Sequence, residues 1–170
     1  MPKASEIGGG WRRMTSFFLI VLLVAAADQF SKFWIQSNLP FQHSLFEIGF
    51  FRITHIHNSG AAFGLFQGYS FALAIVASVG VALLLTYALV VYRRYPFLDN
   101  LPNRVAVGLI LGGTVGNLID RLRFGYVTDF IDLNFWPAFN VADSAVTVGA
   151  ILFAYSILFI AGGEKYRAIG

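Results

Sequence analysis

Hydrophobic residues are concentrated in four long runs along the chain, and polar segments separate these runs. The runs cover about residues 14–35, 69–92, 105–120 and 141–160. A helix needs about 20 apolar residues to cross the roughly 30 Å hydrocarbon core of a bilayer, and each run approaches that length. The pattern therefore predicts an all-α membrane protein, a four-transmembrane-helix bundle in which residues 1–170 form a single domain.

The first run also has features of a cleavable signal peptide. Arg12 and Arg13 precede an apolar core, and the alanines at positions 25–27 are typical of a cleavage site. Apolar and aromatic residues resume at Phe30 and continue to Ile35, which extends the run to the length that a membrane requires. We therefore predict that this run is a retained membrane span.

Two segments between the runs, residues 38–68 and 121–140, are too polar to cross a membrane. In the first of them, Phe51, Ile53, His55 and His57 occupy alternate positions. Alternation with a period of two is typical of a β-strand with two different faces. We expect a short strand or hairpin here, outside the membrane.

Composition supports a membrane location and narrows the chemistry. Hydrophobic residues make up 57% of the chain and charged residues only 12%, which is about half the charged fraction of a soluble domain. The net charge of +3 comes from few groups and does not indicate a nucleic-acid partner. The chain has no cysteine, which excludes disulfides, thiolate metal ligands and a cysteine nucleophile.

The distribution of basic residues predicts the orientation of the bundle, because Lys and Arg accumulate on the cytoplasmic side of a membrane. Eight of the twelve basic residues fall on the side that carries both termini: Lys3, Arg12, Arg13, Arg93, Arg94, Arg104, Lys165 and Arg167. The other side has four: Lys32, Arg52, Arg121 and Arg123. Both termini are therefore expected in the cytoplasm.

Polar and ionisable residues near the spans gather at the opposite, extracytoplasmic end. A polar side chain at membrane depth is costly, so it indicates a functional site. The residues that share this layer are Asp28, Lys32, Asn58, Asn117, Asp120, Arg121, Asp129, Asn140 and Asp143. One layer of such groups predicts a single site, whereas carboxylates scattered through the midplane would predict an ion pathway.

Several members of this layer also have a purely structural interpretation. Asp28 and Lys32 are four residues apart, so they share a helix face and can neutralise each other. Gly112 and Gly116 form a G-x-x-x-G motif, which is typical of close helix packing. A turn accounts for the Asn-Ser-Gly sequence at residues 58–60, and an ion pair at a helix end accounts for the adjacent Asp and Arg at residues 120 and 121.

Asn140 and Asp143 form a variant of the capping box at the start of the fourth span. A helix amino terminus favours the ionised form of Asp143. Asp129 precedes it by a segment that contains Pro137 and is long enough to fold back and bring the two carboxyl groups together. Two adjacent carboxyl groups cannot both ionise easily, so they share a proton and can act as general base and general acid in peptide hydrolysis.

Other catalytic chemistries have less support in the sequence. His55 and His57 point the same way on the expected strand and could bind a metal, but the only other histidine is His43 and there is no H-E-x-x-H pattern, so a metal site is not expected. Ser31 and Lys32 are adjacent and diverge on a helix, which argues against a Ser-Lys pair. No G-x-S-x-G nucleophile motif is present.

Five segments, in order, resemble motifs of the lipoprotein signal peptidases, also called type II signal peptidases, and the resemblance covers nearly the whole chain. These segments are Asp28-Gln29-Phe30-Ser31-Lys32, Asn58-Ser59-Gly60-Ala61-Ala62-Phe63-Gly64, Gly112-Gly113-Thr114-Val115-Gly116-Asn117-Leu118-Ile119-Asp120-Arg121, Val127-Thr128-Asp129-Phe130 and Phe139-Asn140-Val141-Ala142-Asp143-Ser144. One departure is the segment between Asp129 and Asp143, which is shorter than is typical of the family.

The resemblance implies four helices with a small extracytoplasmic β-structured cradle, in a bacterial cytoplasmic (inner) membrane. It implies an aspartic endopeptidase whose catalytic residues are Asp129 and Asp143, with no metal or organic cofactor. The implied substrate is a prolipoprotein, cleaved before a cysteine that carries diacylglycerol. Supporting or substrate-binding roles are expected for Asp28, Lys32, Asn58, Gly60, Asn117, Asp120, Arg121 and Asn140. Membrane lipids are the other expected partners, and a monomer is expected.

Two other classes of function remain as alternatives. A small proton-coupled transporter would also place carboxylates in membrane helices, and would show ion-coupled flux without precursor processing. In a non-catalytic membrane scaffold, Asp129→Asn and Asp143→Asn would change no activity.

Overall fold

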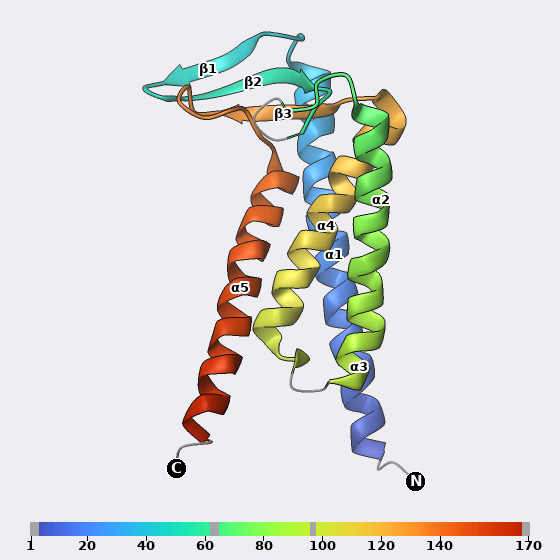
Figure 1. Cartoon of the computed structure of the whole chain (residues 1–170). Helices are drawn as coiled ribbons and strands as arrows, with labels where there is room; N and C mark the ends of the chain where they lie inside the picture. The colour runs from blue at the N-terminus through green and yellow to red at the C-terminus, as the bar shows by residue number, and fades with distance from the viewer. Residues whose placement is uncertain (1–3, 62–64, 96–97, 168–170) are drawn as a thin grey trace.

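The chain forms four long helices with a small antiparallel sheet across one end of the bundle (Figure 1). The computed structural model describes residues 4–61, 65–95 and 98–167. Lys3 and positions 62–64 of the second motif lie outside the described residues. The helices begin and end in this order: α1 Ala4–Asn38, α2 Ser70–Thr86, α4 Leu101–Phe124 and α5 Val141–Arg167.

These helices supply four segments that are long and apolar enough to cross a membrane: Arg13–Asn38, Ser70–Arg94, Leu101–Phe124 and Val141–Leu158. The second segment continues from α2 through one π-helical turn, Tyr87–Val91, into the short helix α3, Tyr92–Arg94. Many large apolar side chains on these segments are exposed on the protein surface, where lipid is the solvent that suits them. The predicted four-helix membrane fold is confirmed.

Helix α4 is the centre of the bundle, because it packs against α1, α2 and α5. Glycines let its backbone approach α1 closely. A Cβ at Gly112 would lie 2.7 Å from Cβ of Val24, and a Cβ at Gly116 would lie 2.5 Å from Oδ2 of Asp28. The packing role predicted for this glycine step is confirmed, and at Gly116 it also brings a carboxylate of α1 against α4.

The ends of α4 follow from local chemistry. Asn100 caps the amino terminus, since its side chain accepts a hydrogen bond from the N–H of Asn103 at 2.9 Å. At the carboxyl end Gly125 adopts a left-handed conformation, with φ of 75°, and its N–H bonds to the carbonyl of Arg121. The helix thus turns sharply into the strand that follows it.

The sheet contains three antiparallel strands in the order β1-β2-β3: β1 Ser44–Ile48, β2 Phe51–Asn58 and β3 Val127–Asp132. The expected hairpin is formed by β1 and β2. Strand β3, in a segment that the sequence pattern marked only as polar, pairs with β2 so that Asp129 lies opposite Ile56. The sheet lies at the end of the bundle remote from the first turns of α1 and the last turns of α5 (Figure 1).

Candidate functional site

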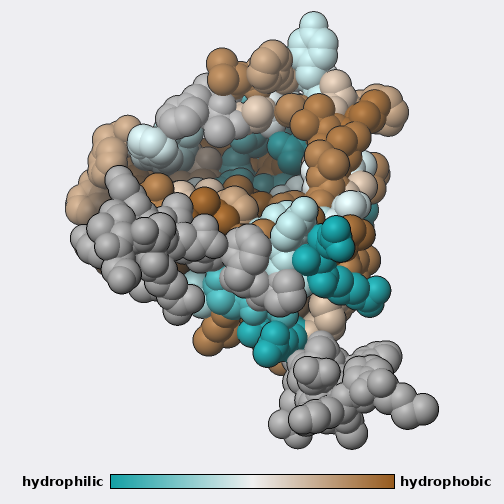
Figure 2. Space-filling model, turned by 60° about the horizontal axis from the view of Figure 1, so that its bottom comes forward, coloured by the Kyte–Doolittle hydropathy of each residue, from teal (hydrophilic) through white to brown (hydrophobic). Residues whose placement is uncertain are grey.

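Asp129 and Asp143 line the same cavity, where β2, β3, α4 and α5 meet. Asp129 lies on β3 and is 2% exposed, and Asp143 lies in the first turn of α5. The cavity has a volume of about 760 Å³. Figure 2 shows the molecule obliquely from the end that carries the termini. In this view the surface is hollowed, with hydrophilic residues deep in the hollow and hydrophobic residues around much of its rim.

Asn140 connects the two acidic residues. Its Nδ2 donates to Oδ1 of Asp129 at 2.7 Å. Its backbone N–H donates to Oδ2 of Asp143 at 3.2 Å, while its Oδ1 accepts from the backbone N–H of Asp143 at 2.9 Å. The reciprocal bonds with Asp143 are those of the predicted cap. The same residue therefore starts α5 and holds a carboxylate from each element.

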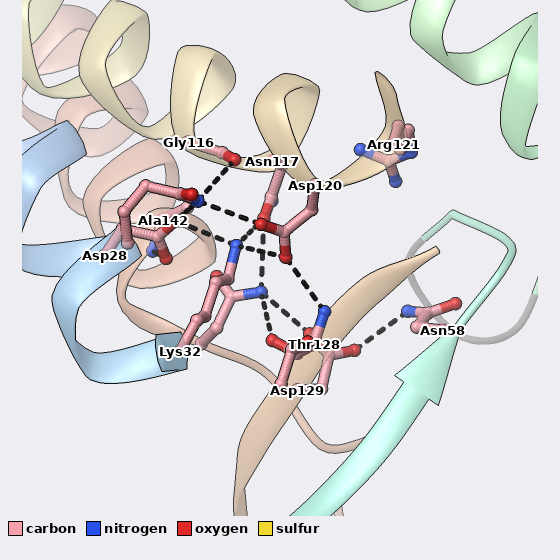
Figure 3. Close-up of polar contacts among 12 residues, drawn as sticks. Asp28, Lys32, Asn58, Gly116, Asn117, Asp120, Arg121, Thr128, Asp129 and Ala142 are labelled. Carbon is pink, nitrogen blue, oxygen red and sulfur yellow. Dashed lines mark hydrogen bonds and ion pairs between the residues drawn. The ribbon is translucent and has the colours of Figure 1, made fainter. Parts of the chain in front are cut away.

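Each carboxylate accepts a second amide donor. Nδ2 of Asn58 donates to Oδ2 of Asp129 at 2.9 Å (Figure 3), and Nδ2 of Asn117 donates to Oδ1 of Asp143 at 2.8 Å. Asn58 is oriented by its own turn, because its Oδ1 accepts from the N–H of Gly60 at 2.9 Å. Amide donors stabilise charge without adding a competing charge, so the pair can hold a negative charge and still exchange a proton.

The pKa of Asp129 is raised to about 7, mainly by burial and to a lesser extent by the nearby carboxylate of Asp143. Hydrogen bonds from Asn58 and Asn140 oppose this rise because they stabilise the ionised form. A carboxyl group with a pKa near neutrality can both accept and donate a proton at physiological pH.

A buried lysine, Lys32, lies between the carboxylates of Asp28 and Asp120 (Figure 3). Nζ of Lys32, which is 2% exposed, lies 2.8 Å from Oδ2 of Asp28 and 3.2 Å from Oδ2 of Asp120. It also donates to Oδ1 of Asn117 at 2.8 Å. Asn117 therefore has its oxygen on the lysine and its Nδ2 on Asp143, which fixes the direction in which its amide points.

The two acidic partners of Lys32 also bind backbone near the carboxylate pair. Oδ1 of Asp28 accepts the N–H of Ala142, in the first turn of α5, at 2.9 Å. Oδ2 of Asp120 accepts the N–H of Thr128, which directly precedes Asp129, at 3.0 Å. The buried ions thus tie α1 and α4 to the two backbone segments that carry the candidate acids.

The structure corrects one local interpretation from the sequence. Asp120 does not pair with its neighbour Arg121 but with Lys32. Arg121 instead extends toward the second motif, where one of its terminal nitrogens donates to the carbonyl of Gly60 at 3.1 Å. Adjacent side chains diverge on a helix, which separates the two groups.

Sequence reasoning missed two residues that support the site. Nε2 of Gln29 donates to Oδ1 of Asp120 at 2.9 Å and to the carbonyl of Gly116 at 3.1 Å. Nε2 of Gln36 donates to the hydroxyl of Thr128 at 2.6 Å. For Gln29 the available signal was its position inside the predicted span 14–35, since glutamine inside a bilayer requires partners in the protein. Gln36 lies just beyond that span, so this signal did not cover it.

The fold and the site together define the class of this protein, a polytopic membrane enzyme with paired acidic side chains in a cavity at one end of its bundle. The family model for signal peptidase (SPase) II matches residues 20–159. The chain therefore belongs to the signal peptidase II family.

Individual relatives agree with this assignment. The chain is 51% identical to a lipoprotein signal peptidase of Dehalococcoides mccartyi over 135 residues, which cover 79% of this chain and 84% of the relative. It is 46% identical to a lipoprotein signal peptidase of Moorella thermoacetica, over 87% of this chain and 96% of that one. A solved bacterial membrane enzyme is similar with a TM-score of 0.79 and 32% identity, over 88% of this chain and 91% of that one.

Proposed function

We propose that this member of the signal peptidase II family removes the signal peptide from prolipoproteins, and that Asp129 and Asp143 are its catalytic residues. The substrate is a precursor whose cysteine already carries diacylglycerol, and the bond cleaved is the one before that cysteine. The observation that carries the assignment of the two residues is that both carboxyl groups face one cavity and are joined through Asn140.

In the proposed mechanism the two carboxyl groups share one proton. One group takes a proton from the attacking water, and the other donates a proton to the oxygen of the scissile carbonyl. The raised pKa of Asp129 supports proton exchange by this pair near neutral pH. The amide groups of Asn58 and Asn117 keep the carboxylates in place while the proton moves.

Arg121 is the proposed contact for the substrate carbonyl. It lines the cavity, and its Nε is buried without a hydrogen-bond partner among the described residues. A guanidinium carries several donors in a fixed plane, so one terminal nitrogen can remain on Gly60 while another donor binds the substrate carbonyl. Such a donor stabilises the negative charge that develops on the carbonyl oxygen.

The apolar side of the cavity suits the lipid of the precursor. Apolar side chains from α5 and from the loop before it line this side: Val146, Val148, Phe135, Trp136 and Phe139. Burial of acyl chain stabilises binding by about 0.8 kcal/mol for each CH₂ group. A substrate with two acyl chains is therefore held where the cavity meets the membrane.

The same proposal includes orientation and assembly. Basic residues predict cytoplasmic termini, and the sheet and cavity lie at the opposite end of the bundle, which directs the site to the extracytoplasmic face of the bacterial inner membrane. All the groups named above come from one chain, so the reaction needs no second copy and a monomer is sufficient.

The direct test is cleavage of a purified diacylglyceryl precursor by wild type, Asp129→Asn and Asp143→Asn. Each variant is expected to lose at least about 100-fold in rate, because proton transfer by a positioned group contributes that much or more. Asp132→Asn is a matched control, since Asp132 is a buried acid on the same strand but pairs with Arg52 at 2.6 Å. Processing that survives both of the first two substitutions would refute the assignment of the catalytic pair.

A further inference from the structure

Two histidines on strand β2, His55 and His57, form a contact that the proposed peptidase mechanism does not use. They are separated by one residue, so they lie on the same side of the strand. Their Nε2 atoms are 3.2 Å apart, and their ring centroids are 5.0 Å apart. Two ring nitrogens from different imidazoles therefore already lie next to each other.

The orientation of His55 is set by the backbone. Nδ1 of His55 lies 2.8 Å from the carbonyl of Leu39, and a carbonyl oxygen can only accept a hydrogen bond. The proton of the neutral His55 ring is therefore on Nδ1, and the lone pair of its Nε2 faces His57. Without an ion, this lone pair accepts a hydrogen bond from Nε2–H of His57, and an ion would take the place of that proton. A backbone carbonyl that accepts from one ring nitrogen, with a lone pair on the other, is the usual arrangement of a metal-binding histidine.

His57 is held by two aromatic rings and faces the cavity. Its ring stacks on Phe41, with centroids 4.2 Å apart, and on Tyr126, with centroids 3.7 Å apart. Burial lowers the pKa of His57, and the neighbouring His55 lowers it further. The neutral imidazole is the form that binds metals. His57 also lines the cavity, so an ion can reach the pair from there.

We propose that His55 and His57 chelate one divalent transition-metal ion, of the zinc, copper or nickel class, in the wall of the cavity. Two imidazole nitrogens at about 2.05 Å from a zinc ion, at a tetrahedral angle, lie about 3.3 Å apart. The observed 3.2 Å agrees with this separation. Imidazole suits these ions, whereas magnesium and calcium prefer oxygen ligands.

No third His, Cys, Asp or Glu joins this pair within residues 4–61, 65–95 and 98–167. The remaining ligands of the ion are therefore water molecules or groups of a bound substrate. Structural zinc sites are closed by four protein ligands, so a site with two protein ligands is expected to hold its ion less tightly than a structural site. Affinity is expected to follow the general order for divalent ions, with copper binding more tightly than zinc.

The expected effect of the ion is inhibition, and this part rests on the proposed function. His57 is followed directly by Asn58, whose amide bonds to Asp129 at 2.9 Å. An ion with its water ligands on His57 would occupy the wall along which the substrate lies. It would therefore raise KM for the precursor more than it lowers kcat.

Binding is tested with the full chain, purified without a histidine tag and titrated with Zn²⁺ in detergent by calorimetry. Wild type is expected to bind one ion per chain, and His57→Gln to bind at least 10-fold more weakly. His43→Gln is the matched control, because His43 is an exposed histidine at the start of the same hairpin whose Nδ1 contacts the carbonyl of Phe41. Equal binding by wild type and His57→Gln, or no saturable binding to wild type, would overturn the site.

A spectroscopic measurement keeps the test decisive if His57→Gln does not fold. The electron paramagnetic resonance spectrum of wild type with one equivalent of Cu²⁺ should show coupling to two imidazole nitrogens. Coupling to a single nitrogen would mean that the pair only shares a proton, which would overturn the proposal.

The effect on activity is measured separately, by precursor cleavage with and without Zn²⁺. Wild type and His43→Gln should show a raised KM, while His57→Gln should be insensitive relative to its own rate without zinc. Binding without a change in KM would overturn the inhibitory effect. Failure of cleavage by wild type in the absence of zinc would instead contradict the proposed function, and the calorimetry would be unaffected.

Discussion

The raised pKa of Asp129 predicts a specific dependence of stability on pH. Its pKa is about 7 in the folded protein, against an ordinary value of 3.8. Between these two values the folded state holds a proton that the unfolded state has released. The free energy of unfolding therefore falls as pH rises from about 4 to about 7, and it levels off above that range.

The magnitude follows from the size of the shift. Each pKa unit corresponds to about 1.36 kcal/mol, so the whole shift corresponds to about 4 kcal/mol. Between about pH 5 and pH 8 the protein should lose about 3 kcal/mol of stability through this one group. Asp129→Asn has no such group and should lack this loss. The difference in unfolding free energy between the variant and wild type should therefore grow by about 3 kcal/mol over the same range.

The assay is reversible denaturant unfolding in mixed micelles at several pH values, for wild type, Asp129→Asn and Asp132→Asn. Taking differences removes the contribution of titrating groups that are not coupled to Asp129, so the difference reports on Asp129 together with its partner Asp143. Asp132→Asn should keep the pH-dependent loss attributed to Asp129, because Asp129 is unchanged in it. If the curves of wild type and Asp129→Asn run parallel from pH 5 to pH 8, the reasoning about burial and carboxylate repulsion is wrong.

Three further predictions concern the surroundings of the pair. Asn58→Ala should move the alkaline limb of the pH-rate profile to higher pH, because it removes a hydrogen bond that lowers the pKa of Asp129, and a pair that works with one shared proton loses activity when that proton leaves; an unmoved limb would contradict this. Lys32→Met should destabilise the fold by about 3 to 5 kcal/mol in denaturant unfolding, since it leaves two buried carboxylates without their cation. Gly113→Ala should lower the melting temperature, because its Cβ would meet the backbone of α5, whereas Gly80→Ala, with nothing within 4 Å, should be neutral or stabilising; equal melting temperatures would contradict the packing argument.

Much of this protein can be predicted from local patterns. Hydrophobic run length determines the number of membrane segments, because the thickness of the bilayer sets a minimum length for a helix. The three-residue spacing of Asn140 and Asp143 in the sequence predicted a helix cap. The cap is present because both partners lie within one helical turn. The ion pair between Asp28 and Lys32 was predictable for the same reason.

Partners far apart in the chain could not be chosen from such patterns. Lys32 was expected to neutralise Asp28, but nothing in the spacing indicated that it would also bind Asp120. The contact from Gln29 to Asp120 links residues 91 positions apart. These contacts depend on how closely α1 and α4 approach, which glycines at the interface permit but do not by themselves direct.

The sequence alone therefore determined that the protein lies in a membrane, which chemical groups are available, and at which end of the bundle the polar groups gather. Each of these depends on residue type and on position along one element. Tertiary structure alone decided which oxygen faces which donor, how β3 places Asp129 beside Asn58, and that His55 and His57 meet through their Nε2 atoms. The physical reason is that hydrogen bonds and ion pairs depend on distances of about 3 Å between elements, and those distances are set only when the helices and the sheet have packed.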